Sequence, residues 1–574
     1  MNANAIWRAV ALALVMGGLA ANESRGAGEK PPAVRPTLVV VVSIDQFPYE
    51  YLQRFRPNFA PDGMFLKFRK DGATFFNCHH GHAVTKTAPG HSVLLTGAFP
   101  NVNGIVGNEW FDRTLGRRVY CVEDRDYRTV GNLAPAADDP DAPYSPRRAA
   151  GSRPDGVSAR SLIAGTLGDV MKLANPAAKV FGIALKDRAA VLMAGHAADG
   201  VFWFDDDNGN WVTSTYYARS LPPYLRNYNE SPAGETFAGQ NWELLLEQDR
   251  YLQYAAPTLP AFAPRPGFPH VLPTKAGPGY YKALATSPFG NQFTLDSARL
   301  IIASEKLGQD DVTDLLAINL SSNDYVGHAY GPHSLEVQDI TLHTDRQLAE
   351  FARLVEEELK GRPWVMALSS DHGVAPVPEY AVGLRLPAER DPLGNVKKAE
   401  AALEVRLVEQ LGSLAPDRTY IQACEDGQVY LDHSLPELRG ERLIVAQRIV
   451  RDWLYEQPDV AVAFIREELL AQNATGGLAL AFQRTLHGQR SGDVLYALRP
   501  YTLAGSSTAN HGSPWEYDSH VPLLFWGAGI RPGRFDTATT PASLAPTLAR
   551  LIGVDPPSCC AVPALGEALA SPAD

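Results

Sequence analysis

The chain has 574 residues, enough for roughly three or four modules of about 150 residues or for one large domain with insertions. Apolar residues make up 45% and charged residues 20% of the composition, which excludes a disordered, collagenous or coiled-coil chain. The formal net charge of −12 gives no electrostatic footprint for nucleic acid or an anionic membrane, so a phosphate-bearing substrate would need a local positive site.

The N-terminal segment has the composition of an export signal. One positive charge precedes an apolar run over residues 9–21, which ends in small residues. This pattern predicts a signal peptide over residues 1–21, because the run is too short to span a bilayer. A buried N-terminal helix is the alternative, but Gly17 and Gly18 disfavour it. We therefore expect a periplasmic or secreted protein with no stable membrane insertion. The five cysteines are odd in number and widely spaced, so their pairing stays open.

Five short apolar runs predict strands that are buried on both faces, as in parallel sheets. Amphipathic stretches between them, at residues 158–174 and 342–360, predict covering helices. This alternation predicts an α/β fold with a doubly wound, mainly parallel sheet flanked by helices. The five runs occupy residues 37–45, 180–187, 314–324, 364–372 and 521–527.

Two regions interrupt this pattern. Residues 200–290 are rich in aromatic residues, proline and glycine, which predicts long loops that could shape a cleft. Residues 376–504 carry helical patterns of their own and predict an inserted α+β subdomain. We therefore expect an α/β core over residues 36–375 with a loop-rich insertion at about 200–290, the inserted subdomain over 376–504 and a return to the core over 505–574.

Aspartates stand at the ends of three of the predicted strands. Asp45, Asp324 and Asp371 follow apolar runs, and ligands of open α/β sheets bind beyond the carboxyl ends of the strands. His328 and His372 place an imidazole beside two of these carboxylates, and mixed Asp/His ligation suits zinc. Each aspartate alone would be an ordinary turn or helix cap. The threefold repetition with histidines attached favours a metal site.

Further histidines lie elsewhere in the chain. The distant His511 could complete the ligand set, although His520, which precedes a predicted strand, competes with it. His91 lies one turn into a predicted helix, where it could pack or orient a ligand. The cluster of histidines at residues 79–82 lies in a glycine-containing loop, and we expect it to be solvated or to support a ligand.

A hydroxyl and a pair of cations complete the candidate site. Thr87 precedes Ala-Pro-Gly and an apolar helical run, so it lies at a predicted helix N-terminus, as an N-cap or as a metal-activated nucleophile. Asn108 offers an amide donor. Lys186 and Arg188 lie two apart at a predicted strand end and so share a face, either as solvated charges or as ligands of phosphoryl oxygens.

These pieces, in this order, resemble the alkaline phosphatase superfamily. Within it the sequence looks most like the monomeric bacterial alkaline phosphatases with a threonine nucleophile, which are related to the nucleotide pyrophosphatase/phosphodiesterases. The motifs are SIDQ at 43–46, TKTAPGHSVLLTGAFPNVNGIVGN at 85–108, NDYVGH at 323–328, SSDHG at 369–373 and ANHGS at 509–513.

The resemblance implies two Zn²⁺ ions per chain, a monomer, and a phosphothreonine intermediate. It implies one ion held by Asp324, His328 and His511. It implies a second ion held by Asp45, Asp371, His372 and the Thr87 oxygen. Asn108, Lys186 and Arg188 would contact the phosphate.

The choice between monoester and diester substrates depends on the two cations. A monoester dianion spreads its charge over three oxygens and can be bound by both Lys186 and Arg188, whereas a diester would leave one of these two cations without a phosphoryl oxygen. Ala88, directly after Thr87, is small where diesterase relatives commonly carry a bulky apolar residue. We therefore expect an exported, metal-dependent alkaline phosphatase acting on small phosphate monoesters, with no nucleic acid partner. The alternatives are a phosphodiesterase/nucleotide pyrophosphatase and a non-catalytic, metal-containing phosphate-binding protein.

Overall fold

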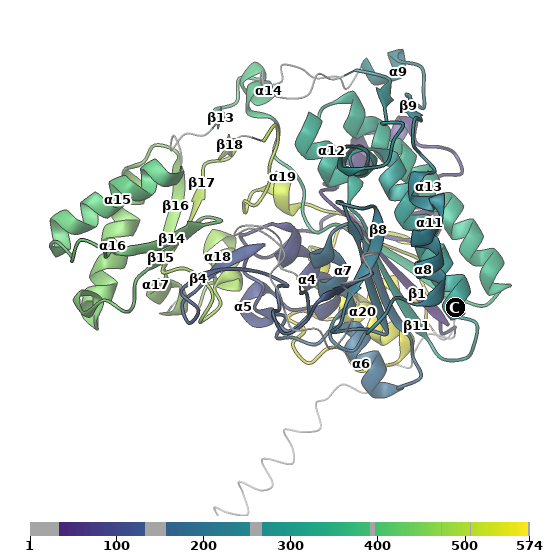
Figure 1. Cartoon of the computed structure of the whole chain (residues 1–574), viewed down its shortest axis with the longest axis horizontal. Helices are drawn as coiled ribbons and strands as arrows, with labels where there is room; N and C mark the ends of the chain where they lie inside the picture. Colours follow the sequence, from purple (N-terminus) through teal and green to yellow (C-terminus); the bar gives the residue numbers. More distant parts are fainter. Residues whose placement is uncertain are drawn as a thin grey trace, which may run out of the picture.

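The computed structural model describes residues 34–131, 156–252, 267–390, 396–471, 473–504 and 507–571, so the predicted signal peptide lies outside the described residues. A ten-stranded sheet forms the core of the larger part of the molecule, on the right in Figure 1. From one edge to the other its strands are β20 (Gly533–Phe535), β2 (Ala73–Phe75), β19 (Leu523–Gly527), β12 (Trp364–Ser369), β1 (Leu38–Ile44), β11 (Asp314–Leu320), β6 (Val180–Ala184), β7 (Gly200–Asp205), β8 (Asn210–Ser214) and β5 (Thr129–Val130).

The central strand β1 illustrates why the sheet forms. Its sequence, LVVVVSI, is rich in β-branched valine, and every residue is buried. β1 pairs in parallel with β11 on one side and with β12 on the other. Since side chains alternate between the faces of a strand, Val40 and Val42 pack in one apolar core, whereas Val39 and Val41 pack in another. Burying each valine contributes roughly 1.5 kcal/mol or more.

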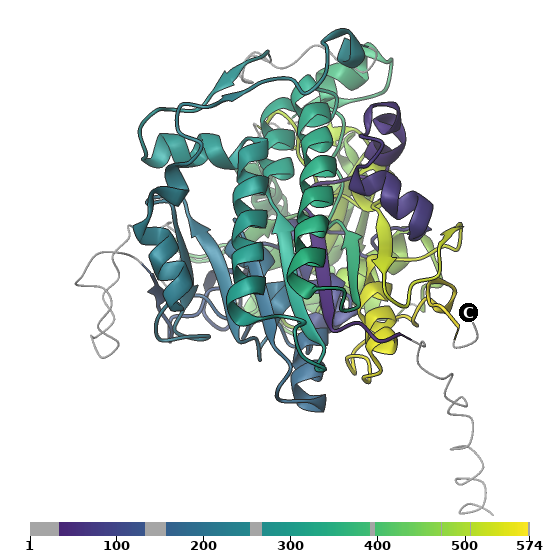
Figure 2. The same cartoon turned by 90° about the vertical axis from the view of Figure 1, so that its right-hand side faces the viewer.

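Helices cover both faces of the sheet. The core around Val40 and Val42 is closed by α11 and α13, which run side by side across one face (Figure 2). α4, α6 and α20 contribute to the core around Val39 and Val41 on the other face, and α7 packs on β6 and β7. The helices of this part are α2 (Glu50–Arg54), α3 (Met64–Asp71), α4 (Thr87–Thr96), α5 (Pro100–Asn103), α6 (Leu167–Ala174), α7 (Asp187–Ala194), α8 (Pro223–Glu230), α9 (Asp249–Leu252), α10 (Pro278–Ala285), α11 (Pro288–Glu305), α12 (Ser322–Tyr330), α13 (Leu335–Leu359), α14 (Pro378–Gly383), α19 (Glu516–Ser519) and α20 (Leu544–Ile552).

The predicted doubly wound, mainly parallel α/β sheet is confirmed, with a larger antiparallel share than expected. Five strand pairings in the large sheet are parallel and four are antiparallel. The run at 521–527 was expected to join as a parallel strand, but β19 pairs antiparallel with both β12 and β2. The expectation was wrong because a strand covered by helices on both faces is apolar throughout in either direction.

The expectation of loops over residues 200–290 was wrong for its first part. β7 and β8 form an antiparallel hairpin at the edge of the sheet, and their residues Phe202, Phe204 and Trp211 belong to the main core. The aromatic residues there are strand formers, and the Asn-Gly turn at Gly209, with φ +81°, closes the hairpin. A two-stranded sheet of β9 (Asn241–Trp242) and β10 (His270–Val271) follows.

Two predicted helices begin at other residues than expected. The helix expected over 158–174 begins only at Leu167, because Thr166 and Asp169 form a capping box that fixes the start of α6. The helix expected over 342–360 begins earlier, at Leu335, where the Ser334 side chain accepts a hydrogen bond from the Val337 amide.

A separate four-stranded sheet lies beside the large one within the region expected to form an inserted α+β subdomain (Figure 1). Its strand order is β14-β15-β17-β16, and α15 and α16 pack against it around an apolar core of their own. The boundaries 376–504 stay a prediction. The elements of this region are α15 (Val396–Leu411), β14 (Ile421–Glu425), β15 (Gln428–Leu431), α16 (Glu441–Glu456), β16 (Val460–Ile465), α17 (Arg466–Ala471), α18 (Gly477–Thr485) and β17 (Val494–Leu498).

Polar contacts join this smaller sheet to the β3–β4 hairpin, in which β3 (Glu109–Asp112) pairs with β4 (Arg117–Tyr120). The Arg113 guanidinium forms an ion pair with the buried Asp493 carboxylate at 2.8 Å. Arg490 donates to the Gly104 carbonyl oxygen at 2.6 Å. β13 (Glu389–Arg390), which precedes the smaller sheet in the chain, pairs in parallel with β18 (Thr502–Leu503), which follows it. This pairing brings together the two segments that connect the smaller sheet to the large one.

Two further findings concern the pairing of the cysteines and the search for membrane-spanning helices. All five cysteines carry free thiols, and burial raises the pKa of the Cys78 and Cys121 thiols well above the ordinary value. Across the described ranges, no helix combines the length and the apolar character that crossing a membrane requires.

Candidate active site and metal-binding groups

Three parallel neighbouring strands deliver aspartates to one edge of the sheet. Asp45 follows β1 directly, and Asp371 lies just beyond β12. Asp324 lies in the first turn of α12, not at the end of β11 as the sequence suggested. Because β1 lies between β11 and β12, the three carboxylates converge at the carboxyl ends of these strands.

The structure brings all the predicted aspartate and histidine ligands into one continuous cluster. Within the described residues, three sets of side chains have ligand atoms within 4.8 Å of one another. Asp45 and Asp324 each belong to two sets and so join them. The sets are Asp324 with His328 and His511, Asp45 with His91 and Asp371, and Asp45 with Asp324 and His372.

The partly exposed group consists of Asp324, His328 and His511. His328 lies one turn after Asp324 on α12, and its Nε2 is 3.2 Å from Asp324 Oδ1. His511 Nε2 lies 3.7 Å from the same oxygen. Nδ1 of His328 donates to the Ala509 carbonyl and Nδ1 of His511 to the Thr85 carbonyl, each at 2.8 Å. With both Nδ1 atoms engaged in this way, each Nε2 atom faces the carboxylate, which is the arrangement of metal-ligating histidines.

We take Asp45, Asp371 and His372 together as the buried group; the three sets divide these residues between them, and none of them is exposed. His372 Nε2 lies 3.2 Å from Asp371 Oδ2 and 3.7 Å from Asp45 Oδ1, while its Nδ1 donates to the Gly373 carbonyl at 2.9 Å. Asp45 Oδ1, Asp371 Oδ2 and His372 Nε2 have no hydrogen-bond partner among the described residues. Leaving such atoms unpaired in the interior is costly, so this donor set fits a divalent cation.

The carboxylates carry more negative charge than their neighbours balance. Burial and the neighbouring Asp371 carboxylate raise the pKa of Asp45 to about 8. Burial also raises the pKa of Asp371, although nearby imidazole and ammonium groups oppose it. Against the effect of burial, the His328 imidazole and the Lys186 ammonium hold the pKa of Asp324 well below its ordinary value. A cation bound here would relieve this repulsion.

Most of the imidazoles are neutral at pH 7. Burial lowers the pKa of His372 to about 4 and that of His91 to about 4. Burial and the neighbouring His372 lower the pKa of His511 well below its ordinary value. His328 differs, because the Asp324 carboxylate raises its pKa in spite of burial. Neutral imidazoles are the form that binds metal ions.

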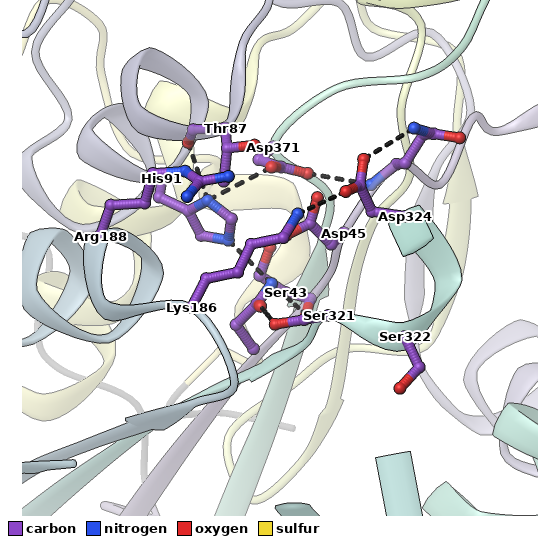
Figure 3. Close-up of polar contacts among 12 residues, drawn as sticks. Ser43, Asp45, Thr87, His91, Lys186, Arg188, Ser321, Ser322, Asp324 and Asp371 are labelled. Carbon is purple, nitrogen blue, oxygen red and sulfur yellow. Dashed lines mark hydrogen bonds and ion pairs between the residues drawn. The ribbon is translucent and has the colours of Figure 1, made fainter. Parts of the chain in front are cut away.

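The two groups touch each other. The His372 ring stacks on the His511 ring with centroids 3.4 Å apart. The Lys186 ammonium reaches one carboxylate of each group, at 2.9 Å from Asp45 Oδ2 and 2.5 Å from Asp324 Oδ2 (Figure 3). In spite of burial, these carboxylates raise the pKa of Lys186, so the ammonium stays charged.

Thr87 is the first residue of α4 and is 2% exposed. The alternative prediction, that Thr87 is the N-cap of this helix, is wrong, because Lys86 is the N-cap. Among the described residues, the Thr87 hydroxyl has no hydrogen-bond partner. The helix can approach the buried group because of Gly90, where a Cβ atom would lie 2.1 Å from the Asp371 carbonyl oxygen. The α4 N-terminus, which favours anions, therefore lies beside the metal-binding groups.

The three predicted phosphate ligands surround this helix start. Asn108 Oδ1 accepts from the Ala88 amide at 2.8 Å, which leaves its NH₂ group free to donate elsewhere. The expectation that Lys186 and Arg188 share a strand face was wrong, because β6 ends at Ala184. Lys186 is the N-cap of α7, and Arg188 lies in its first turn. A short helix with its N-terminus at the sheet edge explains how both cations point into one site.

Arg188 is held by its neighbours. Its Nη1 donates to the Tyr120 hydroxyl at 3.3 Å, and that hydroxyl donates to Asp187 Oδ1 at 2.6 Å. Although burial opposes it, the proximity of Tyr120 and Asp187 raises the pKa of Arg188 well above its ordinary value. Its buried Nε has no partner among the described residues. A permanently charged guanidinium with donors to spare suits an anionic ligand.

Two buried residues beyond the predicted ligands contact the site. His91 Nδ1 donates to the Thr87 carbonyl at 2.8 Å, and its Nε2 accepts from the Asn319 side chain at 2.9 Å. Gln46, to which sequence analysis gave no role, donates from its side chain to Asp324 Oδ1 at 2.7 Å. Its position directly after Asp45 was the only signal that could have found it.

The competing histidines lie outside the metal-binding groups. His520 Nε2 donates to the Phe76 carbonyl at 2.9 Å, and its ring stacks on those of His79 and Tyr49. His80 is buried, and its Nε2 donates to the Ser370 carbonyl at 3.0 Å. Neither His520 nor the 79–82 cluster belongs to the sets of side chains with converging ligand atoms in the described residues.

The chain is similar to known proteins over most of its length. A model of the family "type I phosphodiesterase / nucleotide pyrophosphatase" matches residues 39–505. The chain is similar to alkaline phosphatase PafA of Elizabethkingia meningoseptica, with 32% identity over 95% of this chain and 96% of the relative. It is similar to alkaline phosphatase PhoV of Synechococcus elongatus, with 32% identity over 91% of each chain.

The fold is likewise similar to solved structures. The crystal structure of wild-type PafA superimposes with a TM-score of 0.81 at 30% identity, and covers 93% of this chain and 99% of that chain. A second PafA structure, with a TM-score of 0.80 and 29% identity, carries substitutions of a threonine, an asparagine, a lysine and an arginine. It covers the same shares of the two chains.

Proposed function

Because the chain belongs to the type I phosphodiesterase/nucleotide pyrophosphatase family of the alkaline phosphatase superfamily, we propose that its site is that of an alkaline phosphatase which hydrolyses small phosphate monoesters. The observation that carries the proposal is that α4, which begins at Thr87, starts beside the two metal-binding groups (Figure 3). The names of the relatives PafA and PhoV support the monoester assignment.

Two Zn²⁺ ions fit this donor set, one held by the partly exposed group and one by the buried group together with the Thr87 oxygen. When bound, they lower the pKa of the Thr87 hydroxyl and neutralise negative charge on the phosphoryl oxygens and the leaving oxygen. The orphaned atoms Asp45 Oδ1, Asp371 Oδ2 and His372 Nε2 support this assignment.

Thr87 is the nucleophile. Its oxygen attacks phosphorus in line, the bond between phosphorus and the leaving oxygen breaks, and the alcohol departs with a proton. The product on the protein is a phosphothreonine at Thr87. A water molecule then attacks the same phosphorus from the opposite side, the bond to the Thr87 oxygen breaks, and inorganic phosphate leaves as the hydroxyl is restored.

Lys186, Arg188 and Asn108 hold the non-bridging oxygens. An ammonium has three N–H donors, and two of those on Lys186 reach Asp45 and Asp324, so one is left for a phosphoryl oxygen. Arg188 offers a planar fork of donors. The same four residue types, in the same order and with the same spacing within each pair, are those substituted in the second PafA structure, which supports carrying these roles to Thr87, Asn108, Lys186 and Arg188.

A monoester dianion matches two cations better than a diester monoanion does. Ala88, next to the nucleophile, is a buried member of the apolar core that contains Ile105 and Val106. Its small side chain therefore provides no apolar surface against which a nucleoside could pack. The family description favours diester hydrolysis as the second candidate function.

One experiment separates these activities. The purified chain is given an aryl phosphate and the corresponding aryl methyl phosphodiester, each with and without a chelator. We expect faster turnover of the monoester and loss of both activities on chelation. Preference for the diester would replace the proposal with its second candidate, and turnover that resists the chelator would exclude the metal mechanism. Tight phosphate binding without turnover would support a binding protein.

The remaining parts of the proposal concern the whole chain. We propose that residues 1–21 direct export to the periplasm or the medium, that residues 376–504 form an inserted subdomain, and that the protein acts as a monomer. Cell fractionation of the expressed full-length chain, followed by mass determination of the mature N-terminus, tests the first point.

A further inference from the structure

Gln46 has a backbone conformation that its residue type rarely adopts. It follows the ligand Asp45, has φ +57° and is 1% exposed. The left-handed region is uncommon for residues other than glycine, and such strain persists only where surrounding contacts hold it. Buried strain next to a metal-binding aspartate therefore points to a role for the Gln46 side chain.

In this conformation Gln46 donates hydrogen bonds to two carboxylates of the site. The Gln46 amide N–H donates to Asp371 Oδ1 at 3.1 Å, in the buried group. The Gln46 side-chain Nε2 donates to Asp324 Oδ1 at 2.7 Å, in the partly exposed group. The left-handed turn directs the backbone amide of Gln46 to Asp371 and its side-chain amide to Asp324, two carboxylates that are labelled in Figure 3.

The two carboxylate oxygens that accept hydrogen bonds from Gln46 determine how each carboxylate is oriented toward its neighbouring histidine. Asp371 Oδ1 also accepts from the His372 amide at 3.0 Å, so Oδ2 is left unpartnered and faces the His372 ring. Asp324 Oδ1 is the oxygen that lies 3.2 Å from His328 Nε2. Gln46 thus fixes one carboxylate rotamer in each metal-binding group.

Gly327 provides the space for the Gln46 side chain. It lies on α12 between two members of the partly exposed group, and a Cβ atom at this position would be 1.9 Å from Gln46 Oε1. That oxygen is buried without a hydrogen-bond partner in the described structure. A side chain at Gly327 would therefore push the Gln46 amide away from Asp324.

We propose that Gln46 is a positioning residue that couples the two metal-binding groups, holding the Asp371 carboxylate through its backbone and the Asp324 carboxylate through its side chain. This inference rests on the proposed function, because it assigns Gln46 a role toward the two ions. Removing the side chain frees only Asp324, so binding of the ion in the partly exposed group weakens while that in the buried group is retained.

The test measures zinc affinity with Gln46→Gly. Glycine adopts φ +57° without strain and keeps the amide N–H to Asp371, so only the side-chain contact is lost. Zinc is transferred from the loaded protein to a chromophoric chelator in a competition titration. We expect one of two ions to bind about 10- to 100-fold more weakly than in the parent chain, as for other residues that orient metal ligands.

Lys360→Gly is the matched control, since Lys360 also has positive φ, ends α13 and lies outside the metal-binding groups. It should leave both affinities unchanged. Two equally tight ions in Gln46→Gly would overturn the inference alone, whereas a parent chain that binds no pair of ions would overturn the proposed function. If Gln46→Gly fails to fold, Gln46→Asn, which tolerates positive φ but is one methylene shorter, carries the same test.

A double-mutant cycle with Gly327→Ala adds a measurement that a general loss of stability would not reproduce. Alanine favours the helix, so the cost of Gly327→Ala should come from displacing the Gln46 amide. We expect Gly327→Ala to weaken the same ion as Gln46→Gly does, and to have little further effect when both changes are combined. Fully additive losses would contradict the coupling.

Discussion

At Thr87 a hydroxyl, a helix N-terminus and two metal-binding groups meet, and this coincidence leads to the first prediction. Replacing Thr87 with alanine removes the oxygen that we propose attacks phosphorus, so kcat for an aryl phosphate should fall by at least about 10³-fold. Thr87→Ser keeps a hydroxyl and should retain a larger share of the activity. Steady-state kinetics and zinc content are measured on both variants. Undiminished turnover by a zinc-loaded Thr87→Ala protein would refute covalent catalysis at this residue.

The two cations of the site differ, and the second prediction depends on that difference. Arg188 contacts the Tyr120 hydroxyl and no metal-binding carboxylate, so Arg188→Ala should affect substrate binding alone. Loss of charge-assisted hydrogen bonds worth about 1.5–3 kcal/mol corresponds to a roughly 10- to 100-fold loss of kcat/KM on a monoester. We expect a smaller loss on the matching diester and none for Arg226→Ala, an exposed change on α8. Equal losses on both substrates would remove the argument for monoester specificity.

Some residues of the site could be predicted from the sequence, and others could not. Asp45, Asp371 and His372 were predicted because each lies beside a recognisable apolar strand. Gln46 was not, because its role depends on a positive φ and on Gly327, which lies on a remote helix. The contacts of Lys186 with two ligand carboxylates likewise depend on the order of the strands in the sheet, which composition and periodicity do not contain.

Among the elements, α6 offers a measurable effect of pH away from the metal-binding groups. Against the effect of burial, hydrogen bonds from the His196 imidazole and from the Thr166 amide lower the pKa of Asp169, which caps α6. The same hydrogen bond raises the pKa of His196, with burial opposing it. The capping carboxylate and this imidazole, which follows α7, therefore depend on each other's charge.

The sign of the effect follows from linkage. The His196 contribution is fully present below the unfolded imidazole value of about 6.5 and is lost as pH rises through the raised folded value. The Asp169 contribution is present above the unfolded value of about 3.9 and is lost as pH falls through the lowered folded value. The pair therefore stabilises the fold most between about pH 4 and 6.5.

The third prediction is that His196→Gln lowers the free energy of unfolding more at pH 5.5 than at pH 8.5. The difference should stay below about 1 kcal/mol, because the imidazole is 33% exposed. Urea unfolding of metal-free protein at the two pH values provides the measurement. The same destabilisation at both would mean that the ionic contact contributes nothing.

The elements also explain which parts of the fold were mispredicted. The continuous apolar pattern identified β19 as buried but could not give its direction, because both orientations bury the same side chains. The β7–β8 hairpin was hidden by nearby prolines and glycines that belong to later segments. Lys186 and Arg188 were placed on a strand end because the start of a short helix such as α7 carries no long period.

In the whole molecule, the site forms where the large sheet meets the smaller one. Lys86, the residue before Thr87, lies 3.6 Å from Asp426, which belongs to the turn between β14 and β15. Arg490 donates to the carbonyl oxygens of Gly104 and Ser161. The smaller sheet therefore supports the segment that carries Thr87 and Asn108, and its helices were predictable from the sequence while this docking was not.

The proposed chemistry requires two metal ions bound side by side at the carboxyl ends of the central strands. Anomalous diffraction from crystals of the zinc-loaded chain, recorded on both sides of the zinc absorption edge, tests it most directly. We expect two peaks, one within about 2.0–2.3 Å of Asp324, His328 and His511 and the other equally close to Asp45, Asp371 and His372. No peak among these side chains, or a single peak elsewhere, would contradict it.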